Sequence, residues 1–123
     1  MHASSEKAQS ELVFKIVGAE DWRHAVDSGT YSGSADDRRD GFIHLSAAVQ
    51  VVGTYRKYFQ NQNALLLVAF SSAALEPELK WEVSRGGALF PHYYGAIPTE
   101  LALWKRDIVE SAQGDVPAFE DLA

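Results

Sequence analysis

The stretch DGFIHLS, which begins at residue 40, places an imidazole and a hydroxyl two positions apart. It reads as a β-strand, in which alternate side chains share a face, so Phe42, His44 and Ser46 lie together. Ile43 and Leu45 take the other face and are predicted to be core. A strand that presents a histidine and a serine at a fixed separation can offer both to one ligand, for acid–base chemistry or for binding.

Both polar residues also have simpler explanations. His44 fits a structural histidine on a strand, and Ser46 is a good N-cap for the helix predicted over residues 47–60. The types and spacing of the pair therefore indicate a candidate site and leave a purely structural role open.

A cluster of charges, DDRRDG at residues 36–41, directly precedes this strand. It ends a segment of about a dozen residues from Thr30 that is predicted to be a loop, and loops of that length in small domains are often functional. The local carboxylates can pair with one of Arg38 and Arg39 at most, so the other guanidinium is a candidate ligand for a phosphate or carboxylate. The alternative is a solvated charge cluster in a surface turn.

Glu82 belongs to a segment, ELKWEVS at 78–84, whose alternation predicts another strand. Leu79, Trp81 and Val83 are expected to face the core, so Glu82 faces solvent or a cleft. An exposed surface glutamate is the simpler interpretation. The functional one is a carboxylate that orients a ribose hydroxyl or stabilises a cationic transition state.

The stretch FPHYYG at 90–95 holds aromatic rings that are costly to leave in water. Phe90 and Tyr94 can form the wall of a pocket, while the proline and glycine set the local backbone geometry. His92 is then either a ligand contact or a satisfied part of an aromatic corner. No metal is predicted, because His44, His92 and Glu82 lack the spacing of a zinc motif.

Hydrophobic periodicity and turn signals divide residues 12–109 into strands and helices. Strands are predicted over 12–18, 40–46, 64–70, 78–84 and 100–109, and helices over 19–29 and 47–60. The run at 64–70 is apolar throughout, so it is expected to be a central strand buried on both faces. The predicted fold class is α+β, with two helices on mixed, mainly antiparallel sheets.

Length and composition limit the class of protein. The 123 residues fit a single domain at 12–109, with a disordered or frayed N-terminus at 1–11 and an acidic tail at 110–123. A net charge of −6 argues against a partner that is an extended nucleic acid. The chain has no cysteine, no signal-peptide pattern and no apolar run of roughly 18 residues, so we expect a cytoplasmic protein with no membrane partner.

With DGFIHLS, the helix after it, KWE and FPHYYG in that order, the chain resembles the small bacterial domain-of-unknown-function family 952. The likeness extends from about Phe14 to Asp107 and includes FKIV, Trp22 and the Gly-Thr-Tyr run at 29–31. The resemblance implies a small α+β domain akin to the ADP-ribosyltransferase fold. Proteins of that fold bind nicotinamide dinucleotide in a cleft between two facing sheets, and no activity is assigned to the family.

The resemblance also implies roles for single residues. His44 matches the histidine on one strand of such a cleft, and Glu82 matches the glutamate on a later strand. Either Tyr94 or Ser46 takes the middle position. His44 and Glu82 are thus the predicted catalytic pair, with nicotinamide dinucleotide as substrate and no other cofactor.

Three functions follow from these features. The first is ADP-ribosyl or 2′-phosphate transfer on a nucleotide-like small molecule, with Arg38 or Arg39 on a phosphate and Phe90 and Tyr94 stacked on a ring. The second is a non-catalytic module that binds a small molecule or a protein. The third is a two-histidine phosphoesterase, for which HLS fits one half and HYY lacks the second aliphatic hydroxyl. All three predict one cleft, and they leave the oligomeric state open.

Overall fold

The computed structural model describes residues 11–109, 119 and 122. The frayed N-terminus predicted for residues 1–11 lies almost wholly outside the described residues. Most of the acidic tail predicted for residues 110–123 lies outside them as well.

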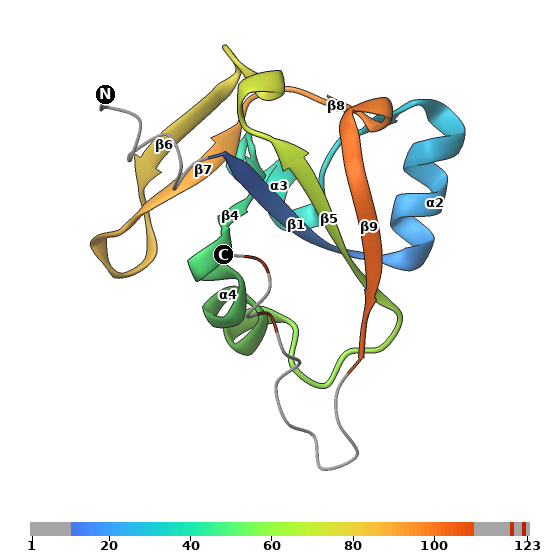
Figure 1. Ribbon diagram of the computed structural model, residues 1–123, viewed down its shortest axis with the longest axis horizontal. Coiled ribbons are helices and arrows are strands. Elements are labelled where there is room, and N and C mark those ends of the chain that lie inside the picture. The colour runs from blue at the N-terminus through green and yellow to red at the C-terminus, as the bar shows by residue number, and fades with distance from the viewer. Residues whose placement is uncertain (1–10, 110–118, 120–121, 123) are drawn as a thin grey trace.

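The main sheet has four antiparallel strands in the order β4-β1-β5-β9 (Figure 1). They are β1 (Leu12–Gly18), β4 (Ser46–Ala47), β5 (Leu65–Ser71) and β9 (Ala102–Ile108). Six of the seven residues of β5 are buried, which confirms the prediction of a central strand covered on both faces. The predicted strands at 12–18 and 100–109 correspond to β1 and β9.

A second sheet, of order β3-β7-β6, lies beside the main one and carries most of the chemically interesting residues (Figure 1). Its strands are β3 (Ile43–His44), β6 (Leu79–Val83) and β7 (Leu89–Tyr93). A short pair, β2 (Thr30–Tyr31) and β8 (Ile97–Pro98), completes the strands that the structure describes. All the pairings are antiparallel, so the α+β class with mainly antiparallel sheets is confirmed.

Two of the three α-helices in the described part of the chain cover opposite faces of the main sheet (Figure 1). Helix α2 (Ala19–Ser28) ends at Gly29, whose φ of 96° is the left-handed conformation that glycine adopts without a Cβ clash. Helix α4 (Val51–Tyr58) follows a 3₁₀ turn, η1 (Ala48–Gln50). The other 3₁₀ turns are η2 (Ala73–Leu75), η3 (Arg85–Gly87) and η4 (Thr99–Leu101).

The third helix, α3 (Ala35–Asp40), occupies the segment predicted to be a loop, so that prediction is wrong. Ser34 caps it: the hydroxyl oxygen of Ser34 accepts from the backbone N–H of Asp37 at 3.1 Å, and the Asp37 carboxylate accepts from the backbone N–H of Ser34 at 2.9 Å. This capping box satisfies two donors that a helix start leaves without partners. The charge cluster hid the signal, because an aspartate takes the position that glutamate or glutamine usually holds.

The alternation of β1 divides the core between the two faces of the main sheet. Val13 and Val17 pack with Trp22 of α2 and with the second sheet, and Phe14 and Ile16 pack toward α4. Two apolar residues of the predicted acidic tail, Phe119 and Leu122, also belong to the α4 side of the core.

The predicted strand at 40–46 is broken in two, and each half joins a different sheet. β3 pairs with β7, and β4 pairs with β1. Between them lies Leu45, whose backbone N–H donates to the carbonyl of Pro91 at 3.0 Å. The alternation itself is correct for Ile43 and Leu45, which are both buried.

Two details of the sequence interpretation are wrong. Ser46 is not a helix N-cap, because α4 begins only at Val51, and the Ser46 hydroxyl bonds to the Thr54 hydroxyl at 3.0 Å. Val83 does not face the core: it lies at the end of β6, and 69% of it is exposed. Leu89, the register partner of Val83 on β7, is exposed as well, so alternation does not predict burial at this end of the two strands.

Candidate functional site

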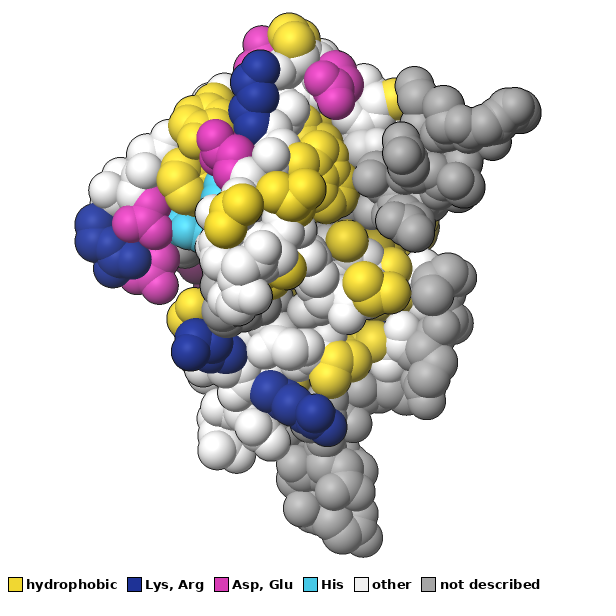
Figure 2. Space-filling model, turned by 90° about the vertical axis from the view of Figure 1, so that its left-hand side faces the viewer, with side chains coloured by type: hydrophobic (Ala, Val, Ile, Leu, Met, Phe, Trp, Pro, Cys, Tyr) yellow, Lys and Arg dark blue, Asp and Glu magenta, His cyan; other side chains and the backbone are white. Residues whose placement is uncertain are grey.

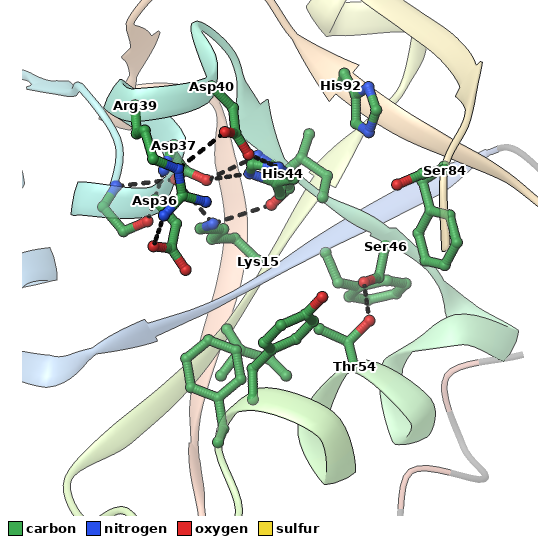
Figure 3. Close-up of a pocket in the computed structure, with 17 residues that line it drawn as sticks. Lys15, Asp36, Asp37, Arg39, Asp40, His44, Ser46, Thr54, Ser84 and His92 are labelled. Carbon is green, nitrogen blue, oxygen red and sulfur yellow. Dashed lines mark hydrogen bonds and ion pairs between the residues drawn. The ribbon is translucent and has the colours of Figure 1, made fainter. Parts of the chain in front are cut away.

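A cavity of about 160 Å³ opens where α3, the two sheets and α4 meet (Figure 3). In the space-filling view, histidine atoms lie in a hollow of the surface beside acidic and apolar side chains (Figure 2). The polar residues that line the cavity are Lys15, Ser34, Asp36, Asp37, Arg39, Asp40, His44, Ser46, Thr54, Tyr58, Ser84 and His92. Phe14, Ile16, Leu45, Phe59 and Phe90 complete the wall.

Asp37 is the centre of the network on the α3 side of the cavity. It is only 2% exposed, and its Oδ2 lies 2.9 Å from Nζ of Lys15, a lysine in the middle of buried β1. Lys15 also donates to the backbone carbonyl of His44 at 3.0 Å. The ion pair therefore connects α3, β1 and β3 and fixes the start of the strand that bears the histidine.

His44 is held at both ring nitrogens by carboxylates of α3. Its Nδ1 lies 2.6 Å from Oδ1 of Asp37, and its Nε2 lies 3.0 Å from Oδ2 of Asp40. The backbone N–H of His44 also donates to Asp37 Oδ1, at 3.1 Å. Any other orientation of this ring would break its contacts with Asp37 and Asp40, so the imidazole is preorganised at the cavity wall.

His92, directly opposite on β7, has a different environment. His44 and His92 are register partners across the sheet, and their ring centroids lie 5.6 Å apart. The Nδ1 of His92 lies 2.7 Å from Oε1 of Glu82, an oxygen that also accepts the Tyr94 hydroxyl at 2.8 Å. Among the described residues, the buried Nε2 of His92 has no hydrogen-bond partner.

An aromatic side chain fixes the plane of this second imidazole. The ring of Phe42 stacks on His92, with centroids 4.0 Å apart and an interplanar angle of 22°. Phe42 also contacts the rings of His44 and Tyr94, at 4.7 and 5.4 Å. Alternation places Phe42 on the same face as His44, and the contact between these two rings agrees with that placement.

The electrostatics of the site follow from burial and pairing. Burial opposes ionisation of Asp37, but the hydrogen bond from His44 and the charge of Lys15 outweigh it and hold the pKa of Asp37 below its usual range. Burial lowers the pKa of Lys15, and the attraction of Asp37 opposes that change. Hydrogen bonds from His92 and Tyr94 lower the pKa of Glu82.

The structure brings five of the eight predicted site residues to the cavity wall: Arg39, His44, Ser46, Phe90 and His92. The prediction of one shared cleft around the two histidines agrees with this geometry. Their roles toward a ligand stay predictions.

The other three predicted residues do not line the cavity. Arg38 donates from Nη1 to the carbonyl of Gly33 at 2.6 Å. Glu82 and Tyr94 lie behind His92 and bond to each other, as described above.

Arg39 is the arginine that pairs with the local carboxylates, as the sequence predicts for one of the two, whereas Arg38, the other candidate ligand contact, does not line the cavity. Arg39 pairs with both Asp36 and Asp40, at 3.0 and 3.1 Å. A phosphate at this point would have to compete with two carboxylates for the same guanidinium.

Sequence reasoning missed the importance of Lys15 and Asp37. The signal for Lys15 was present, since a lone charge in an otherwise apolar strand needs a buried partner. Asp37 was treated only as a local partner for an arginine. Thr54 and Ser84 were also missed, and isolated hydroxyls in a sequence carry no signal of this kind.

Within residues 11–109, 119 and 122, no group of three or more histidine or acidic side chains is arranged to hold a metal ion. None of the helices that the structure describes is long and apolar enough to cross a membrane.

Solved structures of protein CC0527 from Caulobacter crescentus are similar to this chain. Its crystal structure has a TM-score of 0.84 and 42% identity, covering 89% of this chain and 96% of that one. A crystal structure of a double mutant of CC0527 has a TM-score of 0.84 and 41% identity, with the same coverage. The solution NMR structure has a TM-score of 0.79 and 42% identity, covering 89% and 94%.

Comparison with curated proteins yields no match. The kinship with the ADP-ribosyltransferase fold stays a prediction. Residues 16–104, more than half of the chain, match the family described as "Protein of unknown function (DUF952)", within the extent that the sequence motifs predict. The chain therefore belongs to the DUF952 family.

Proposed function

We propose that the protein binds a small nucleotide-like molecule in the cavity between α3, β3 and β7, with His92 as the buried polar contact. The observation that carries the proposal is the Nε2 atom of His92, which is buried, lies on a cavity-lining ring and has no partner among the described residues. A buried polar atom without a partner costs roughly 1–3 kcal/mol. A ligand that supplies the missing hydrogen bond recovers that free energy, so this atom favours an occupied cavity.

The lining supports a ligand with both hydroxyls and an apolar ring. Asp36 and Asp40 are carboxylates that accept hydrogen bonds, as ribose hydroxyls require. Phe90 and the partly exposed Phe59 supply apolar surface on which a flat ring can pack. Cavities for drug-sized ligands measure about 300–1,000 Å³. The 160 Å³ found in this cavity therefore suits one sugar or one ring, with the rest of a dinucleotide outside it.

The proposal is restricted to binding because the expected catalytic carboxylate is engaged elsewhere. Glu82 does not line the cavity, and its Oε1 accepts from His92 and Tyr94. Stabilisation of an oxocarbenium-like centre requires a carboxylate that faces that centre. ADP-ribosyl transfer through Glu82 would thus need a rearrangement of the His92–Glu82–Tyr94 contacts.

The two-histidine phosphoesterase has one observation in its favour, the two imidazoles that share the cavity. The acidic lining and the engagement of Arg39 weigh against a phosphate group between them. The same argument applies to 2′-phosphate transfer. Binding of a nucleotide-like molecule through its sugar or ring is therefore the better-supported function.

Calorimetric and NMR titrations with oxidised nicotinamide dinucleotide, ADP-ribose and adenosine 2′-phosphate test the proposal. We expect at least one to bind wild type and to weaken about tenfold in His92→Ala, because about 1.4 kcal/mol corresponds to a factor of ten. His24→Ala, which changes an exposed histidine of α2, is the matched control and should bind like wild type.

Failure of all three probes to bind wild type at millimolar concentration would contradict the proposal. So would binding that His92→Ala leaves unchanged. His92→Gln, which retains a polar side chain of similar length, serves if His92→Ala does not fold. Turnover of nicotinamide dinucleotide, measured with the same variants, separates an enzyme from a binding module.

A further inference from the structure

The contact between His92 and Glu82 fixes which ring nitrogen carries the proton. The Nδ1 of His92 lies 2.7 Å from Oε1 of Glu82, and the Tyr94 hydroxyl donates to the same oxygen. An ionised carboxylate only accepts hydrogen bonds. Nδ1 must therefore be the donor, and in the neutral ring Nε2 then carries a lone pair.

That lone pair belongs to the atom that has no partner among the described residues. His92 is 4% exposed and lines the cavity, where Figure 3 shows its ring on the same wall as His44 and Ser84. In the neutral ring, the buried polar atom at this wall is thus an acceptor and not a donor.

We propose that Glu82 is a positioning residue, which holds His92 as the Nδ1–H tautomer so that Nε2 accepts a hydrogen bond from a ligand hydroxyl. The inference rests on the proposed function and adds the direction of the hydrogen bond, in which the ligand donates and His92 accepts. A ribose hydroxyl or an amide N–H can donate to Nε2, whereas a phosphate dianion can only accept. A donor group, not a phosphate, therefore lies at His92. We assign a ribose hydroxyl to this position, because Asp36 and Asp40 of the same cavity also accept hydrogen bonds from hydroxyls.

Two further contacts support this assignment. The Phe42 ring stacks on His92 at 4.0 Å and limits its rotation about the Cβ–Cγ bond. The hydrogen bonds from His92 and Tyr94 keep the pKa of Glu82 below its usual value, so this side chain is an acceptor at neutral pH. The α3 carboxylates contact His44 and not His92, so Glu82 is the carboxylate that directs this ring.

Long-range ¹H–¹⁵N correlation spectra of the histidine side chains test the tautomer in the free protein. We expect the wild-type His92 signals to show protonated Nδ1 and unprotonated Nε2. Glu82→Gln should reduce this preference, because an amide can donate or accept at Nδ1. Glu100→Gln, at an exposed position of η4, is the matched control and should leave the tautomer unchanged. The Nε2–H tautomer in wild type, or an unchanged tautomer in Glu82→Gln, would overturn the inference.

Binding of adenosine and of 2′,3′-dideoxyadenosine tests whether a ribose hydroxyl of the ligand donates to His92. Wild type should bind the dideoxy compound about tenfold more weakly, and Glu82→Gln should narrow that difference. Equal affinities in wild type would overturn the assignment of the sugar to His92. If adenosine, ADP-ribose and nicotinamide dinucleotide all fail to bind, the proposed function and the ligand's position fail together. The spectrum of the free protein still decides the tautomer in that case.

Discussion

Asp37 makes more contacts than any other charged side chain at the cavity that the structure describes. It accepts hydrogen bonds from the backbone N–H groups of Ser34 and His44 and from the His44 ring, and it pairs with Lys15. With its side chain 2% exposed, the carboxylate has exchanged water for these partners. Ser34, Lys15 and His44 thus depend on Asp37 for their positions, even though other groups are better placed to touch a ligand.

Asp37→Asn should destabilise the fold by about 3–5 kcal/mol, because it leaves Lys15 as an unpaired charge in the interior. Urea-induced unfolding measures the change. Asp36→Asn is the control: its only described ion pair, with Arg39, is exposed, and such pairs contribute roughly 0–1 kcal/mol.

Addition of Lys15→Met to Asp37→Asn should recover part of the lost stability, since the unpaired charge is then removed. Destabilisation of less than about 1 kcal/mol by Asp37→Asn would contradict the central role given to this carboxylate.

At the scale of the element, the short helix α3 positions site residues, and the backbone packs closely against Asp37 where this helix starts. Gly33, directly before the cap, has a φ of 103°, and a Cβ there would lie 2.7 Å from Cβ of Asp37. Both the backbone conformation and the space therefore require glycine. The tight turn at Gly33 allows α3 to place Asp37 and Asp40 next to His44.

Gly33→Ala should destabilise the protein by more than about 1 kcal/mol, since alanine fits neither the φ value nor the space. Gly53→Ala is the contrasting variant: Gly53 lies within α4 with no atom near its added Cβ, so the change should stabilise the helix by about 0.8–1 kcal/mol. Thermal or urea unfolding of both variants measures these opposite signs. A neutral Gly33→Ala would contradict the close approach.

At the scale of the whole molecule, the fold could be predicted where local pattern decides structure. Alternating or continuous apolar residues predicted the strands β1, β5, β6 and β9, because the hydrophobic pattern that marks a strand lies within its own sequence. The switch at Leu45 between two sheets could not be predicted, since it depends on pairing with strands distant in sequence. His44 was found from its position on a predicted strand, and His92 from the aromatic stretch around it. Their carboxylate partners are near in sequence, but which carboxylate meets which ring depends on how α3 packs on β3 and on the register of β6 and β7.

The lowered pKa values of the site carboxyls predict how the whole protein responds to acid. Asp37, Asp40 and Glu82 all have folded-state pKa values below their usual ones, so the folded state binds fewer protons than the unfolded chain. Their stabilisation is complete above the unfolded pKa values, about 3.9 for aspartate and 4.3 for glutamate, and is lost as the pH falls toward the folded values.

Stability should therefore decrease below about pH 4.5, and the decrease should be smaller in Asp37→Asn, whose amide does not titrate. Urea unfolding between pH 2.5 and 7 (roughly the range in which these carboxyls titrate) gives the comparison. A variant whose stability falls as steeply as that of wild type would show that Asp37 does not contribute to the acid response.

The measurement that bears most directly on the site is a titration of wild type with ADP-ribose, followed by the ¹⁵N signals of the histidine side chains. A ligand hydroxyl that donates to His92 should move the Nε2 signal of His92 in a saturable way, with smaller changes at His44 and none at His24. Saturable binding that leaves the His92 signals in place would contradict the assignment of His92 as the buried ligand contact. So would the failure of ADP-ribose, nicotinamide dinucleotide and adenosine 2′-phosphate alike to bind at millimolar concentration.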